Sequence, residues 1–360
     1  MRKILFFSIT FLLVMFVGCK DKVEIFNGEI ILINKANLID SLKAERIELD
    51  GIYTGYMAVY DSLMFFLSSK YPDNYLHIFN INTGQPMGSY CKKGEGPSEF
   101  YYFTHNEQYE NIHGDIKLWG YNDLDNIYLL NITQSVRANS TCVEQTIDHN
   151  WRKVHTRPWA TYFMRDNNVL VKSQPEYLDD DESALSLGSY SLYNLTVDSL
   201  LREYRLYNRM PDIEDPSPFL IENIFYSDDK IDVDKKKIAM AMNLLAQINI
   251  LDLETGTLRG FRLKESPDFD EFTKKSYTPT IYYTDLNATA EFLYALYSEI
   301  ELDGSRQYPF ESREIHVFDW NGNMLRQIIL EHKAREIAID HISGYLYTIN
   351  EMEEIFRYKL

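Results

Sequence analysis

The stretch from Trp151 to Trp159 is the most basic and aromatic part of an otherwise acidic chain, with two indole rings and several cationic side chains. An indole ring can stack on a sugar or on a cationic group, and an arginine can hold a carboxylate through two hydrogen bonds. Because loops on a rigid scaffold commonly carry ligands, Trp151, Arg157 and Trp159 are candidate ligand-binding residues. The alternative is a connector that buries a tryptophan between two structural units and leaves its charges in solvent.

A second candidate site lies at Lys92 and Lys93, which are followed by Gly94-Glu95-Gly96-Pro97. Lysines beside glycine amides can form an anion-binding edge. The alternative is a backbone turn between two strands, because glycine and proline at this density favour turns. The spacing is not that of a nucleotide-binding P-loop, so no nucleotide site is predicted.

No other spacing predicts a metal site or a nucleophile. Asp228, Asp229, Asp232 and Asp234 lie close together, but lysines follow where a calcium loop needs its glycine and terminal glutamate. The histidines lack zinc-binding spacing, and no serine lies in a nucleophile-elbow motif. We therefore assign no catalytic residue, no metal ligand and no cofactor.

The N-terminus has the features of an export signal. Met1 to Lys3 form a basic start, and the uncharged run that follows to Gly18 is shorter than the roughly 20 residues of a membrane-spanning helix. Gly18 directly before Cys19 resembles the lipobox of bacterial lipoproteins, in which the cysteine is acylated and becomes the new N-terminus. This resemblance implies a signal peptide over residues 1–18, a lipid on Cys19 and a tether over residues 19–44. An ordinary secretory signal with a chance cysteine is the alternative.

A lipid anchor would place the protein on a membrane of the cell envelope. Lys20 stands where well-studied lipoproteins retained at the inner membrane carry an aspartate, so the resemblance implies the outer membrane. The full chain has a net charge of −18. This charge argues against nucleic acid, whose binding depends on basic groups that neutralise phosphates. The expected partners are the membrane and an envelope protein, peptide or glycan.

A repeated strand and turn predicts the fold. The segment from Ile78 to Gly84 recurs as a hairpin around Asp252, and in weaker form around Asn131, Asn194 and Asp319. An Asn or Asp that bonds its own backbone, followed by glycine, is typical of a tight hairpin turn. Such spacing indicates six four-stranded units, with boundaries near residues 52, 100, 158, 220, 277 and 334. We predict an all-β, six-bladed β-propeller over residues 45–360.

Both ends of the chain contribute to the last predicted blade. Three strands from residue 334 to the C-terminus lack a fourth, and a spare strand lies at residues 46–49. We predict that this N-terminal strand completes the last blade and closes the ring, because closure removes exposed strand edges. Cys91 and Cys142 fall at equivalent positions of neighbouring blades, too far apart for a disulfide, and are predicted to be free.

The run from Lys92 to Phe100 resembles the Gly-x-Gly-Pro-x-Glu-Phe motif of the TolB-like six-bladed β-propeller lipoproteins of Bacteroidetes, with Ser98 where a glycine is common. The resemblance implies the fold and says little about activity. We expect a non-enzymatic envelope lipoprotein that binds a partner on its propeller. The alternative is a lactonase-like hydrolase whose metal or acid-base groups, scattered in sequence, come from the first strands of several blades and line the axial channel.

Overall fold

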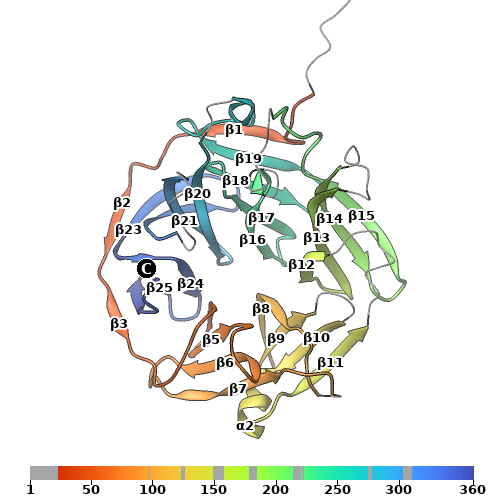
Figure 1. The fold of residues 1–360 in the computed structure, drawn as a ribbon, viewed down its shortest axis with the longest axis vertical. Helices are drawn as coiled ribbons and strands as arrows, with labels where there is room; N and C mark the ends of the chain where they lie inside the picture. The colour runs from red at the N-terminus through yellow and green to blue at the C-terminus, as the bar shows by residue number, and fades with distance from the viewer. Residues whose placement is uncertain are drawn as a thin grey trace, which may run out of the picture.

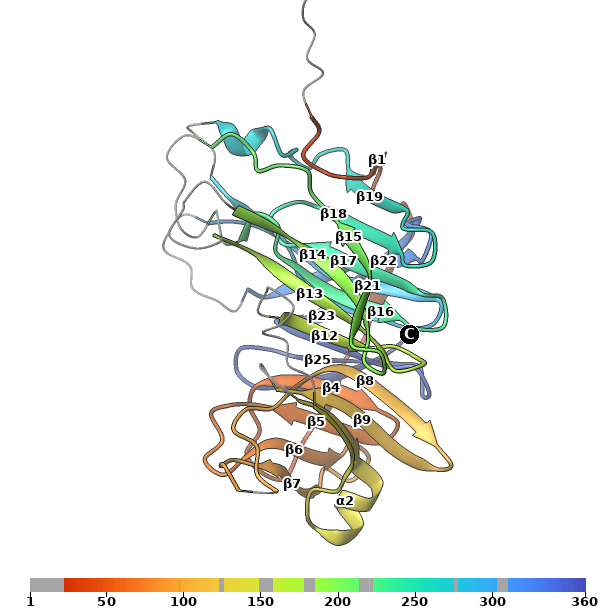
Figure 2. The same cartoon turned by 90° about the vertical axis from the view of Figure 1, so that its right-hand side faces the viewer.

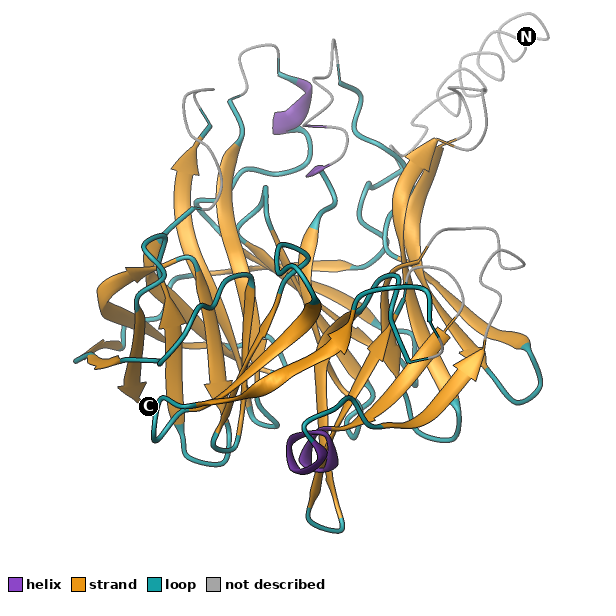
Figure 3. Cartoon of the chain, turned by 60° about the horizontal axis from the view of Figure 1, so that its bottom comes forward, coloured by secondary structure: helices purple, strands orange, loops and turns teal. Residues whose placement is uncertain are grey.

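The computed structural model describes residues 23–96, 98–122, 126–148, 158–177, 185–213, 220, 223–274, 278–302 and 310–360. Six sheets are arranged around a central axis (Figure 1), and strands make up almost all of the described regular structure (Figure 3). The predicted all-β, six-bladed propeller is therefore confirmed. No helix in these ranges is long and apolar enough to cross a membrane.

Each blade is a meander of four antiparallel strands. Blade 1 contains β4 (Tyr56–Tyr60), β5 (Leu63–Leu67), β6 (Asn74–Asn80) and β7 (Pro86–Lys92). Blade 2 contains β8 (Thr104–Ile112), β9 (Asp115–Tyr121), β10 (Asn126–Asn131) and β11 (Val143–Asp148). Blade 3 contains β12 (Pro158–Phe163), β13 (Asn168–Tyr177), β14 (Leu185–Asn194) and β15 (Ser199–Arg205).

The other three blades continue the same order. Blade 4 contains β16 (Ser227–Asp232), β17 (Lys237–Met242), β18 (Gln247–Asp252) and β19 (Leu258–Leu263). Blade 5 contains β20 (Thr280–Ala288), β21 (Phe292–Glu301), β22 (Ser312–Asp319) and β23 (Met324–Ala334). Blade 6 contains β24 (Glu336–Asp340), β25 (Tyr345–Ile349) and β26 (Ile355–Lys359), together with β3 (Glu45–Ile47) from the N-terminus.

The ring closes as predicted. β3 pairs antiparallel with β26, so that Ile47 lies opposite Ile355. Both residues belong to the apolar core between blades 6 and 1, together with Met64 and Phe66. An N-terminal strand thus supplies the last strand of the last blade and leaves no open gap in the ring.

The segment before β3 differs from the predicted tether. β1 (Glu29–Ile33) and β2 (Ile39–Leu42) add a fifth, parallel strand to the outer edges of blades 4 and 5, beside β19 and β23. Figure 1 shows β1, β2 and β3 following one another along the rim. Ile31 and Ile33 pack against the core between blades 4 and 5, so burial of their side chains fixes this segment. The expectation of a free tether up to residue 44 was wrong for residues 29–42.

Apolar residues form one core between each pair of neighbouring blades. β5 illustrates the pattern: Phe65 packs into the core between blades 1 and 2, and Phe66 packs into the core between blades 6 and 1. Neighbouring side chains of a strand point to opposite faces, so a strand buried on both faces needs a continuous apolar run such as Leu63 to Leu67. The six cores make the propeller a rigid support for the residues at its axis.

The repeated turns have the predicted chemistry, with one exception. The side-chain oxygen of Asn80 accepts hydrogen bonds from the amides of Asn82 and Thr83, at 3.0 and 3.1 Å, and Gly84 has a φ of +71°. Asp252 makes the equivalent turn in blade 4. In blade 2, Asn131 instead caps the short helix α2 (Ile132–Ala138), which projects from the rim (Figure 2). The tight hairpin predicted at Asn131 was therefore wrong. Asparagine is favoured both in tight turns and at helix N-termini, so the sequence pattern did not separate the two.

Candidate binding site at the propeller axis

The first strand of every blade lies at the axis. Several of these first strands contact the first strand of a neighbouring blade, as β24 does with β4 and β20, and β8 does with β12. They carry the charged residues that we call the axial cluster: Glu107, Asp228, Lys230, Asp285 and Glu336. These five side chains come from four blades, so the cluster exists only in the folded ring.

Glu107 reaches across the axis. It lies at a bulge in β8 and has a φ of +54°, a left-handed conformation that turns its side chain away from the regular course of the strand. Its carboxylate accepts hydrogen bonds from Lys230 Nζ of blade 4 at 2.6 Å and from Asn287 Nδ2 of blade 5 at 3.1 Å. Blades 2 and 5 are opposite each other in a ring of six. These contacts therefore link side chains of opposite blades across the axis.

Neighbouring side chains of β8 hold this bulge in place. Gln108 pairs with the backbone of Phe163 on β12, accepting from its amide at 2.6 Å and donating to its carbonyl at 2.8 Å. Asn106 donates to the carbonyl of Thr161 at 2.8 Å. The two amide side chains thus replace the backbone ladder that is missing between blades 2 and 3, and they fix the position of Glu107.

Two further acids join the first strands of neighbouring blades. Asp285 accepts from the backbone amides of Leu286 at 2.8 Å and Ile337 at 2.7 Å. Glu336 accepts from the amide of Met57 at 2.7 Å. Edge amides at the axis have no partner strand, so carboxylates satisfy them. The acids thereby stabilise the ring as well as charging its centre.

Burial and mutual repulsion change how these acids titrate. Burial, and then repulsion by Asp285 and Asp229, raises the pKa of Asp228 to about 7. Burial also raises the pKa of Asp285 to about 6, although Lys230 opposes the shift. The pKa of Glu336 is raised well above its ordinary value, first by burial and then by Asp285. Each shift has the sign expected for carboxyl groups that have too few cations near them.

A second ion pair next to the cluster is fully satisfied. Lys172 Nζ lies 2.6 Å from Asp229 Oδ2, and their side chains are only 8% and 2% exposed. Tyr190 and Ser227 donate further hydrogen bonds to the carboxylate of Asp229, at 2.5 and 2.7 Å. This carboxylate therefore has an ion pair and two hydrogen bonds within the protein. We therefore assign the pair to the structure of the propeller and not to ligand binding.

Aromatic side chains surround the axial cluster where the first strands of blades 1 to 4 begin. We call Tyr56, Tyr102, Trp159 and Tyr226 the aromatic collar. Tyr56 is 74% exposed and Trp159 is 50% exposed, whereas most aromatic residues of the propeller lie in the cores. The rings of Trp159 and Tyr226 meet edge to face at 6.4 Å.

The collar and the carboxyl groups lie together. The hydroxyl of Tyr226 donates to Asp228 Oδ1 at 3.2 Å. Loss of hydration near the axis, followed by the charges of Glu336 and Asp228 and the neighbouring Tyr102, raises the pKa of Tyr56 even though much of its side chain is exposed. One end of the axis therefore presents exposed aromatic rings directly beside carboxyl groups that lack sufficient positive charge.

Comparison with known proteins agrees with this architecture. A family described as TolB-like 6-blade propeller-like matches residues 201–341. The chain is a six-bladed propeller that resembles the TolB-like family over these residues. No curated protein matches its sequence.

Two solved structures from Bacteroides share the fold of this chain. A member of the DUF4221 family from Bacteroides vulgatus has a TM-score of 0.54 and 9% identity, covering 88% of this chain and 97% of the other. A putative exported protein from Bacteroides fragilis has a TM-score of 0.50 and 13% identity, covering 91% of this chain and 98% of the other. At these identities the likeness shows the fold alone.

The predicted site residues fall in different parts of the propeller. Trp159 lies in the aromatic collar, on the first strand of blade 3. Lys92 lies on β7, at the outer edge of blade 1, and Lys93 directly follows this strand. The structure therefore does not bring these lysines into the collar. Trp151, Arg157 and Cys19 lie outside the described residues.

Both lysines of the predicted anion-binding edge already have partners. Lys92 Nζ lies 2.7 Å from Glu99, whose carboxylate also accepts from the amide of Gly96 at 3.1 Å. Lys93 Nζ donates to the carbonyls of Ser69 and Tyr71. Glu99, the glutamate of the family motif, thus takes the place that an external anion would take at this edge. This geometry agrees with the alternative of a structural turn.

The sequence signal missed most of the axial cluster. In the sequence, Asp228 is one of several clustered aspartates. In the structure, it lies with Asp285 and Glu336 from two other blades. In the described ranges, no group of three or more His, Cys, Asp or Glu residues is arranged to hold a metal ion. An alignment of the six blade starts by position would have been needed to find these acids.

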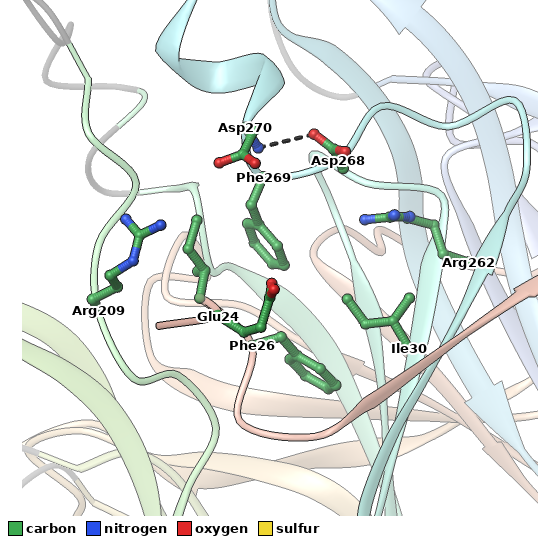
Figure 4. Close-up of a pocket in the computed structure, with 9 residues that line it drawn as sticks. Glu24, Phe26, Ile30, Arg209, Arg262, Asp268, Phe269 and Asp270 are labelled. Carbon is green, nitrogen blue, oxygen red and sulfur yellow. Dashed lines mark hydrogen bonds between the residues drawn. The ribbon is translucent and has the colours of Figure 1, made fainter. Parts of the chain in front are cut away.

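A separate pocket lies at the rim, where the N-terminal segment crosses blade 4. Figure 4 shows Arg209 and Arg262 on opposite sides, with the rings of Phe26 and Phe269 between them. Acids also line it, namely Glu24, Asp268 and Asp270. Both signs of charge are present, so the lining does not select one ligand class. We assign no ligand to this pocket.

Proposed function

We propose that this protein is a lipid-anchored binding scaffold of the cell envelope that holds a protein, peptide or glycan partner at the aromatic collar. The observation that carries the proposal is the exposure of Tyr56 and Trp159 beside the carboxyl groups of the axial cluster. Exposed aromatic rings on a rigid scaffold, with polar groups beside them, are typical of binding surfaces. The two exposed rings come from different blades, so their separation is fixed by the fold.

The proposed location rests on the sequence and on one relative. Cys19 in its lipobox-like context supports a lipid anchor, Lys20 supports the outer membrane, and a structure of the same fold is described as a putative exported protein. Arg209 Nε donates to the carbonyl of Val23 at 2.7 Å, so the chain is held to the body four residues after Cys19. Four extended residues span about 14 Å, which would keep the rim near the membrane.

A hydrolase is the second candidate, favoured by one observation. The carboxyl groups of Asp228 and Asp285 repel each other and have pKa values of about 7 and about 6. Neighbouring carboxyls with different pKa values can serve as an acid and a base. Both oxygens of Asp285, however, already accept backbone amides, from Leu286 and Ile337, so this carboxyl is engaged in holding the ring together. Binding without catalysis is therefore the better-supported function.

A binding panel tests the proposal. The full-length protein in detergent is applied to arrays of envelope glycans and of peptides, beside the double variant Tyr56→Ala/Trp159→Ala. The matched control is Leu200→Ala/Leu201→Ala, which removes two exposed side chains from the outer strand β15. Ligands that are lost with the collar variant and kept with the control support the proposal. Equal binding by both variants would show that the collar is not the site.

A further inference from the structure

We propose, resting on the function above, that the collar binds a lysine or arginine side chain of a polypeptide partner, which enters between the aromatic rings and meets Asp228 and Asp285. Three observations support this ligand class. They are the charge balance of the axial cluster, the chemistry of the collar and the side-chain contacts of Glu107 across the axis.

The charge balance leaves two acids without a cation of their own. Lys230 pairs with Glu107 at 2.6 Å, and Arg335 lies 3.5 Å from Glu336 and 3.4 Å from Glu353. In the described part of the chain, neither Asp228 nor Asp285 has a lysine or arginine nitrogen within ion-pair distance. A cation from a partner would supply the missing charge.

The collar chemistry also selects a cation. The face of an aromatic ring attracts ammonium and guanidinium groups, more strongly when water is displaced. Tyr226 lies between the two parts of the site, because its ring contacts Trp159 and its hydroxyl donates to Asp228. A carboxylate ligand would instead be repelled by both the rings and the acids. The net charge of −18 of the whole chain acts in the same direction over a longer range.

The contacts across the axis favour a side chain presented by a larger partner. Glu107, Lys230 and Asn287 link blades 2, 4 and 5, so their side chains occupy part of the centre of the ring. A lysine or arginine carries its charge at the end of a flexible apolar stem, which suits a shallow site with aromatic walls. The remainder of the partner would lie on the exposed faces of Tyr56 and Trp159.

The surroundings of Asp228 make the binding of a cation depend on pH. The groups that face Asp228 are Asp229 and Lys230 of β16, Asp285 of β20 and Lys172 of β13, and repulsion by the acids outweighs attraction by the lysines. A bound cation favours the ionised form of Asp228, so binding strengthens as pH rises through about 7. With one linked proton, affinity is about tenfold lower at pH 6 than at pH 8.

The probes are a short uncharged peptide with one central lysine, the same peptide with arginine, and a form with acetylated lysine. Binding to the full-length protein in detergent is measured by calorimetry at pH 6 and pH 8. We expect the lysine and arginine peptides to bind at least tenfold more tightly than the acetylated peptide at pH 8. Asp228→Asn should remove most of this preference, and Asp285→Asn is the second variant if the first does not fold.

Asp166→Asn is the matched control. Asp166 is exposed in the β12–β13 turn with a φ of +61°, a conformation that asparagine also adopts readily. If lysine and acetylated lysine bind equally, the ligand class is wrong. The proposed function still stands in that case if Trp159→Ala abolishes binding of a glycan or of an uncharged peptide. If no ligand depends on Trp159 or Tyr56, both proposals fail.

Discussion

The buried pair of Lys172 and Asp229 gives the sharpest test of how the propeller centre is stabilised. Lys172→Met removes the ammonium but keeps the length of the side chain. Asp229 would then be a carboxylate in a site where its side chain is 2% exposed, with hydrogen bonds only from Tyr190 and Ser227. Breaking a buried pair by removing one partner costs about 3–5 kcal/mol. We expect a loss near the lower value, about 3 kcal/mol, because those hydrogen bonds persist.

The expected loss depends on pH and on the second partner. Lowering the pH should reduce the loss, because a buried carboxylate that has lost its only cation is less unfavourable once it is neutral. Lys172→Met/Asp229→Asn removes both charges and should cost about 1 kcal/mol or less, since the buried charge is gone.

Urea unfolding at pH 7 and pH 5 measures these free energies. The control is Arg165→Met, which breaks the exposed ion pair with Asp234 and should cost less than about 0.5 kcal/mol. A loss below about 1 kcal/mol for Lys172→Met at pH 7 would show that the ion pair does not stabilise the propeller centre. So would a double variant that is less stable than the single one.

Three further substitutions test the closure of the ring, the packing at Gly94 and the lipid anchor. Ile47→Asp places a charge in the core that closes the ring, and should cost at least about 3 kcal/mol in urea unfolding and promote aggregation; wild-type stability would contradict closure by β3. Gly94→Ala should cost about 1–3 kcal/mol, because Gly94 has a φ of +149° and an added Cβ would meet the Glu99 carboxylate; an unchanged unfolding midpoint would contradict this packing. Cys19→Ala should move the protein from the membrane to the soluble fraction, and continued membrane association would contradict a lipid anchor.

The fold was predictable from sequence because its signals are local. A turn such as Asn80 to Gly84 is set by one side chain and one glycine, so its copies can be recognised without knowledge of the remaining structure. The closing strand was predictable by counting, since the last blade lacked one strand. Asn131 shows the limit, because the same capping chemistry starts a helix there.

The outer strands β1 and β2 and the axial cluster were not predictable in the same way. Both strands pair in parallel with residues more than 200 positions away, and no turn marks such a pairing. The cluster draws single acids such as Asp285 and Glu336 from separate blades, and each looks unremarkable in its own strand. Trp159 was found because its own surroundings in the sequence are unusual.

Site-specific photo-cross-linking tests whether a partner binds at the collar. A photoreactive phenylalanine replaces Tyr56 in the collar or, as control, Leu201 on the outer strand β15, and both positions are exposed in the structure. Cells that produce each variant are irradiated, and the envelope is analysed for adducts. We predict a discrete adduct from position 56 that weakens when Asp228→Asn is added, and none from position 201. A discrete adduct from position 201, with none from position 56, would contradict this prediction.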